Sequence, residues 1–218
     1  MKQLSERFRT IALDLRGHGD SGGKPGIDYS ISRMSDDIHE LVDGLGLKDC
    51  LFVGHSLGAA IVVKFVAKYG MTSGIVLTGA SRQIQSGLSV FFLELLMRFR
   101  GLAEKVVTPR MFAPNAPGEL LEFVRSESKR SSAEVLMAVM RQIAGADSIT
   151  DLKKIEVPAI VVAGEFDGII APEEQRRVAD ILDAKFIVMK GAGHNLMLEE
   201  PGAFSKLIEE FALSLSIR

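Results

Sequence analysis

Apolar residues recur along this chain in two different patterns, and the two patterns alternate. Short apolar runs of strand length occupy residues 8–13, 51–53, 74–78, 159–163 and 186–189. Segments with apolar residues at helical spacing occupy residues 31–45, 59–69, 172–182 and 201–215. Because strands and helices that alternate in this way form parallel sheets covered by helices, the pattern predicts an α/β fold with a mostly parallel sheet.

The pattern changes between residues 81 and 147, where no strand-like run occurs and Phe, Leu and Met recur at helical spacing. We therefore expect residues 1–80 and 148–218 to form one core, with residues 81–147 inserted as a helical cap. Such an insertion most often covers the strand ends where these sheets bind ligands. The most apolar stretch, residues 88–97, is shorter than the roughly 20 residues of a membrane span and predicts a helix with a wide apolar face.

One glycine-flanked serine stands between a predicted strand and a predicted helix, in Gly54-His55-Ser56-Leu57-Gly58. A serine at the apex of a sharp strand-to-helix turn needs small residues two positions before and after it, so that strand and helix can approach. Gly54 and Gly58 meet that requirement. Ser56 is therefore a candidate nucleophile, and the alternative is a plain glycine-rich turn.

Two polar residues, Asp167 and His194, follow later predicted strands. A serine hydroxyl is a weak nucleophile near neutral pH, so it needs a base to take its proton and a third group to orient that base. His194 and Asp167 suit these roles. The alternatives are a histidine that caps a turn, a turn aspartate, and Glu165 as the acid, and spacing alone does not decide among them.

The other potentially reactive residues suggest structural roles. His55 adjoins Ser56, but consecutive side chains diverge, so we expect it to pack beside the turn. His18 lies in a glycine-rich loop with a structural or pocket-edge role. Cys50 cannot form an internal disulfide, and its apolar surroundings predict a buried thiol in a reducing compartment. No two histidines have metal-ligand spacing with a carboxylate, and no phosphate loop occurs, so we expect no metal and no cofactor.

Composition excludes some partners for this chain of 218 residues. A formal net charge of -2 and scattered Lys and Arg argue against nucleic acid as the main partner. The first residues are too polar for a signal peptide, and no stretch suits a membrane span, so we expect a cytoplasmic protein without membrane contact.

The motifs together resemble the α/β-hydrolase superfamily. Residues 54–58 resemble its nucleophile elbow, 161–167 its strand ending in the triad acid, 191–194 its histidine loop, and 14–21 a loop common in esterase-like members. The order Ser56, Asp167, His194 is the order that this family uses. The resemblance implies an N-terminally truncated α/β-hydrolase fold with an inserted helical cap, and it favours Asp167 over Glu165.

The resemblance also implies an activity, that of a carboxylesterase-like serine hydrolase. Such an enzyme cleaves carboxylic ester, thioester or lactone bonds through an acyl-enzyme, here on a small hydrophobic acyl substrate. Ser56 would attack, His194 would relay the proton, Asp167 would orient His194, and the Leu57 N–H would be one donor of the oxyanion hole. Relatives that attack alkyl halides or epoxides carry aspartate at the elbow. The alternatives are a ligand-binding protein with little or no turnover, and a cofactor-free perhydrolase with the same triad.

Part of the family pattern has no counterpart in the chain. Residues 8–13 resemble the family's fourth strand, so the three earlier strands and the loop with the second oxyanion donor have no match. The family's third strand lies between its fourth and fifth, here residues 8–13 and 51–53. We therefore expect either that these two strands pair directly or that the first is displaced, with self-association across the gap as one way to close it. A shortened chain or mistaken start, a fragment completed by another polypeptide and a natural non-catalytic short protein all fit this pattern.

Overall fold

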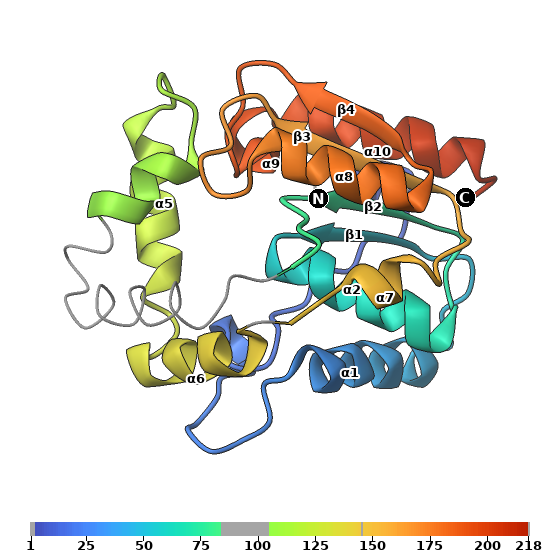
Figure 1. Ribbon diagram of the computed structural model, residues 1–218, viewed down its shortest axis with the longest axis horizontal. Helices are drawn as coiled ribbons and strands as arrows, with labels where there is room; N and C mark the ends of the chain where they lie inside the picture. Colours follow the sequence, from blue (N-terminus) through green and yellow to red (C-terminus); the bar gives the residue numbers. More distant parts are fainter. Residues whose placement is uncertain (1–2, 84–104, 145, 218) are drawn as a thin grey trace.

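A computed structural model describes residues 3–83, 105–144 and 146–217. Its four strands form one parallel sheet in the order β1-β2-β3-β4 (Figure 1). They are β1 (Leu51–His55), β2 (Gly74–Thr78), β3 (Ala159–Gly164) and β4 (Lys185–Met189). The predicted α/β fold with a parallel sheet is therefore confirmed.

Helices precede, separate and follow the strands, and the four longest of those around the sheet lie where the pattern predicts helices. Around the sheet lie α1 (Ile31–Gly44), α2 (Leu57–Tyr69), α7 (Ile149–Leu152), α8 (Pro172–Leu182), α9 (Leu196–Glu199) and α10 (Pro201–Ser214). Short 3-10 helices are η1 (Leu4–Glu6) and η2 (Gly19–Ser21). Local chemistry sets their ends: the Ser30 side chain accepts a hydrogen bond from the Arg33 N–H at the start of α1, and left-handed Gly70 ends α2.

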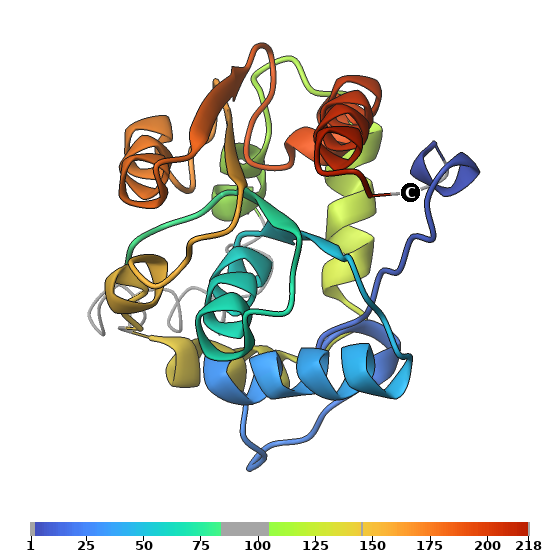
Figure 2. The same cartoon turned by 90° about the vertical axis from the view of Figure 1, so that its right-hand side faces the viewer.

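Two apolar layers cover the sheet, because alternate strand residues face opposite sides. Ile75 and Leu77 belong to the larger core, which includes buried residues of α1, α2 and α8. Val76 and Val162 belong to the smaller core, where Phe204 of α10 packs. Figure 2 shows α8 and α10 on opposite sides of the sheet. The fold thus leaves the carboxyl ends of all four strands along one edge of the sheet.

The predicted first strand is wrong: residues 8–15 contain neither helix nor strand. They form no ladder with β1, so the outcome is closer to the displaced alternative than to direct pairing. Within the described ranges β1 pairs with β2 alone, and Ile11, Leu13 and Val53 are 42%, 43% and 42% exposed. An alternating apolar pattern becomes a strand only beside a partner ladder, and residues 8–15 lack one.

The described part of the segment between β2 and β3 contains helices and no strand, apart from an isolated antiparallel bridge between Gln83 and Asp147. It contains η3 (Thr108–Met111), α5 (Gly118–Ser128) and α6 (Ala133–Ile143). Val135 and Val139 of α6 join the larger core. The Gln142 side chain accepts a hydrogen bond from the Tyr29 N–H and donates one to the Ile27 carbonyl. The division into core and cap stays a prediction, and the helix predicted for residues 88–97 lies outside the described residues.

Candidate active site

The turn after β1 has the strained geometry that the sequence predicts. Ser56 has φ 52° and ψ −115°, in a region that non-glycine residues seldom adopt, and its N–H donates to the Thr78 carbonyl at 2.9 Å. A Cβ on Gly54 would lie 2.7 Å from the Ala59 Cα, so glycine is required there. A Cβ on Gly58 would meet no described atom within 4 Å, so the expected steric need for glycine at that position is wrong.

Asp167 and His194 form a buried pair after β3 and β4. The side-chain atoms Asp167 Oδ2 and His194 Nδ1 are 2.9 Å apart, and the two residues are 7% and 2% exposed. Asp167 Oδ1 accepts from the backbone N–H groups of Ile169 and Ile170 at 2.9 Å each. Burial raises the pKa of Asp167, but the hydrogen bond from His194, its charge and these N–H groups outweigh burial and hold that pKa below its usual range.

The ionised carboxylate fixes the tautomer of His194. A carboxylate can only accept, so Nδ1 carries the hydrogen and Nε2 keeps a lone pair that can take a proton. The rival acid Glu165 binds elsewhere: its carboxylate accepts from the Gly191 N–H at 3.0 Å and from Lys190 Nζ at 3.2 Å. The geometry thus brings Asp167, and not Glu165, to the imidazole.

Close backbone packing holds together the loop after β3, which carries Asp167, and the loop after β4, which carries His194. A Cβ on Gly164 would lie 1.9 Å from the Gly193 carbonyl oxygen, and the Phe166 N–H donates to the Ala192 carbonyl at 2.8 Å. Residues of η3 lie over both loops. The Arg110 carbonyl accepts from the Gly168 N–H at 3.1 Å, and the Met111 carbonyl accepts from the Asn195 N–H at 3.0 Å.

His55 packs against His194, with ring centroids 4.5 Å apart. Burial, reinforced by the charge of His194, lowers the pKa of His55 to about 3. Its Nδ1 is buried and has no hydrogen-bond partner among the described residues. His55 is therefore neutral near pH 7 and lies beside the turn, as expected from its place next to Ser56.

Ser56 is linked to the Asp167–His194 pair indirectly, through the residues at the end of β2. Its N–H is bonded to Thr78, and the next residue, Gly79, packs so tightly on the imidazole that a Cβ there would lie 2.6 Å from His194 Cε1. Within the described residues no hydrogen bond joins Ser56 Oγ to His194. Such bonds are often long in unliganded enzymes and tighten when substrate binds.

Leu57 is the first residue of α2, so its N–H has no acceptor within the helix. Aligned peptide dipoles make this end of the helix partly positive. Leu57 therefore presents an N–H next to Ser56, the position expected for an oxyanion donor.

Sequence reasoning missed two side chains near the pair, the buried Gln175 and the half-buried Glu199. Gln175 of α8 is 0% exposed and bonds to Asp167, and the only sequence signal is a polar residue on the apolar face of an amphipathic helix. The Glu199 carboxylate accepts from the N–H groups of Gly193 and Ala113 at 2.8 and 2.7 Å, and so ties the His194 loop to the residues after η3. Cys50 precedes β1 and is only partly buried, contrary to expectation.

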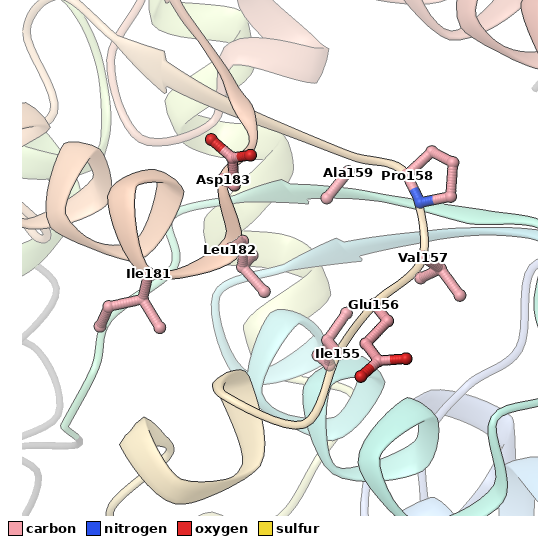
Figure 3. A pocket seen from close by; sticks show the side chains of 8 residues that line it. All are labelled: Ile155, Glu156, Val157, Pro158, Ala159, Ile181, Leu182 and Asp183. Carbon is pink, nitrogen blue, oxygen red and sulfur yellow. The ribbon is translucent and has the colours of Figure 1, made fainter.

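The described residues contain no group of three or more His, Cys, Asp or Glu that could hold a metal ion. No helix among them has the length and apolar character of a membrane span. A groove of about 410 Å³ lies at the amino end of β3 and is lined by residues such as Val157, Leu182 and Asp183 (Figure 3). It is at the end of the sheet opposite to Asp167.

Comparisons with known proteins agree with the fold described above. A family profile described as "Alpha/beta hydrolase family" matches residues 1–207. The chain is 28% identical to the non-heme haloperoxidase of Rhodococcus erythropolis, over 87% of this chain and 76% of that protein. A thermophilic esterase from Thermogutta terrifontis, solved with malate bound, is 26% identical with a TM-score of 0.90, over 98% of this chain and 83% of the esterase. An enol-lactonase from Burkholderia xenovorans LB400 is 26% identical with a TM-score of 0.87, over 96% and 83%.

Replacing Gly164 tests the close approach of the two loops. We expect Gly164→Ala to lower the free energy of unfolding by about 3 kcal/mol, because the new methyl group collides with a backbone carbonyl that cannot swing aside. Gly202→Ala in α10 is the matched control, since a Cβ there meets no described atom within 4 Å and alanine favours the helix. Urea unfolding measures both. Equal stabilities of the two variants would contradict the packing described here.

Replacing His55 tests its neutral state. In the unfolded chain a histidine titrates near pH 6.5, whereas folded His55 titrates at about 3, so only the unfolded chain gains this proton as the pH falls. Stability is therefore complete above about pH 6.5 and falls below it, by at most about 1.4 kcal/mol per pH unit from this residue. We expect His55→Gln to flatten the pH dependence of the free energy of unfolding between about pH 4.5 and 6.5. Parallel curves for variant and wild type would contradict this.

Proposed function

Because this chain belongs to the alpha/beta hydrolase family, we propose that it is a serine hydrolase that cleaves ester, thioester or lactone bonds through an acyl-enzyme. The observation that carries the proposal is the buried hydrogen bond of 2.9 Å between Asp167 and His194, at the same edge of the sheet as the strained turn of Ser56. An oriented imidazole at the same edge of the sheet as a serine in a strained turn is the arrangement that nucleophilic acyl transfer requires.

The proposed reaction has two halves. Ser56 Oγ attacks the substrate carbonyl carbon while His194 Nε2 takes the hydroxyl proton, and the Leu57 N–H donates to the oxyanion that forms. The carbonyl then re-forms, the bond to the leaving oxygen or sulfur breaks, and that atom takes the proton from His194. Water repeats the sequence on the acyl-enzyme, so that the carboxylic acid leaves and Ser56 regains its hydrogen.

The relatives support the acyl class of substrate. Two similar structures are named an esterase and an enol-lactonase. Serine at position 56 agrees with this chemistry. We propose a small hydrophobic acyl substrate, in keeping with Phe166, which is 47% exposed beside Asp167.

A second candidate function is perhydrolysis, which is supported by the relative named a non-heme haloperoxidase. In this reaction hydrogen peroxide would replace water in the second half, release a peracid from the acyl-enzyme, and so supply an oxidant for halide. A third candidate is ligand binding without turnover, which would fit the absence of a hydrogen bond between Ser56 Oγ and His194 in the described residues.

Aryl ester hydrolysis tests the proposed function. We expect steady release of nitrophenol from p-nitrophenyl acetate and labelling of Ser56 by a fluorophosphonate, located by peptide mass spectrometry. Ser56→Ala should abolish both, and Asp167→Asn should lower kcat by about 10⁴-fold because the imidazole loses its orienting acceptor. Ser214→Ala, at the exposed end of α10, should leave both unchanged.

The same samples separate the alternatives. Peroxide-dependent bromination in acetate, lost in Ser56→Ala, would favour the perhydrolase. Absence of both turnover and labelling at Ser56 in the wild-type chain would contradict the hydrolase and favour the ligand-binding protein.

A further inference from the structure

Gln175 is a buried polar residue that the proposed reaction does not use. It lies near the start of α8 and is 0% exposed, on the face where Val178 and Ala179 are also buried. Burying an amide without hydrogen bonds costs stability, so the partners of such a group indicate what it holds in place.

The Gln175 amide is bonded at both ends. Its Nε2 donates to Asp167 Oδ2 at 3.0 Å and to the Ile170 carbonyl at 2.9 Å, and its Oε1 accepts from the Gly79 N–H at 2.8 Å. The reverse orientation would oppose an NH₂ to an N–H and an oxygen to two acceptors, so only one orientation is consistent with the partners.

The first of these bonds fixes the direction of the Asp167 carboxylate. One oxygen, Oδ1, is held by the N–H groups of Ile169 and Ile170, and the other, Oδ2, is shared between Gln175 and His194. Rotation of the carboxylate away from the imidazole would break bonds at both oxygens. Gln175 thus holds Oδ2 where His194 Nδ1 donates to it.

The bond to Gly79 fixes the other side of the imidazole. Gly79 has φ 57°, and its backbone lies so close to the ring that a Cβ would be 2.6 Å from His194 Cε1. The His194 ring also packs against His55. The charged residues next to Gln175 on its helix are engaged elsewhere: Glu174 is paired with Arg82 at 3.0 Å, and Arg176 lies over the Phe186 ring. One neutral side chain therefore links the acid after β3 to the backbone after β2.

We propose that Gln175 is a positioning residue of this site, which sets the alignment of the His194 imidazole by holding Asp167 on one side and Gly79 on the other. The proposal rests on the proposed hydrolase function, but its structural part concerns the Asp167–His194 hydrogen bond alone. It predicts that loss of the amide lowers the rate of the chemical step more than it lowers the affinity for substrate.

Gln175→Met is the first test, because methionine has similar length and no hydrogen-bonding amide. We expect kcat for p-nitrophenyl acetate to fall about 10- to 100-fold, with KM within about twofold of wild type. Gln142→Met is the matched control, since Gln142 also links two backbone groups but lies away from Asp167. It should change the melting temperature and leave kcat unchanged. Equal kcat losses in the two variants would overturn the proposal.

Gln175→Glu is the second variant, because it keeps the acceptor for Gly79. Only its protonated form can still donate to Asp167 Oδ2, and burial raises the pKa of such a carboxyl toward neutral pH. We expect the ratio of variant to wild-type kcat to fall as the pH rises from 5 to 9. A ratio that does not change with pH would overturn the proposal.

Proton NMR of His194 separates this proposal from the proposed function. The Nδ1 proton bonded to Asp167 should give a downfield signal in wild type and in Gln142→Met, and the signal should be lost or broadened in Gln175→Met. An unchanged signal in a folded Gln175→Met protein would overturn the positioning role. If the wild-type chain neither hydrolyses esters nor labels at Ser56, the hydrolase proposal fails, while the NMR result still decides the role of Gln175.

Discussion

The buried carboxylate of Asp167 sets the main constraint on this end of the molecule. A charge removed from water must be matched by donors, and Asp167 takes them from two backbone N–H groups, from Gln175 and from His194. These donors can meet only because β3 and β4 end side by side and glycine at position 164 lets the next loop approach. The orientation of the His194 imidazole thus depends on the hydrogen bonds that stabilise the Asp167 carboxylate.

Backbone hydrogen bonds connect the loops that carry Asp167 and His194 to segments that are distant in sequence. The loops after β3 and β4 also bind the carbonyl groups of η3, and Glu199 binds Ala113 just beyond it. The helical segment between β2 and β3 therefore bears directly on Asp167 and His194. Changes in that segment can alter the pair through backbone hydrogen bonds, without any new side-chain contact.

The sequence predicted the features that local pattern determines. Helices with strong apolar periodicity, the runs of β2 and β3, and the turn at Ser56 all follow from spacing and residue type. Residues 8–13 misled because an alternating run specifies a strand only where a neighbour offers hydrogen bonds, and that neighbour is not visible in the run itself. Gln175 escaped notice because a single glutamine acquires meaning only from partners at positions 79, 167 and 170, which folding brings together.

The position of β1 at the rim of the described sheet affects how firmly Ser56 is held. A strand inside a sheet can open only by breaking ladders on both sides, whereas β1 breaks one, to β2. On its other side β1 pairs with no strand within the described residues, so the protection of its amide groups there against hydrogen exchange depends on α2 and the core beneath. How firmly the strained conformation of Ser56 is maintained therefore depends on the free energy of local opening of β1 and α2. This free energy can be smaller than the free energy of global unfolding.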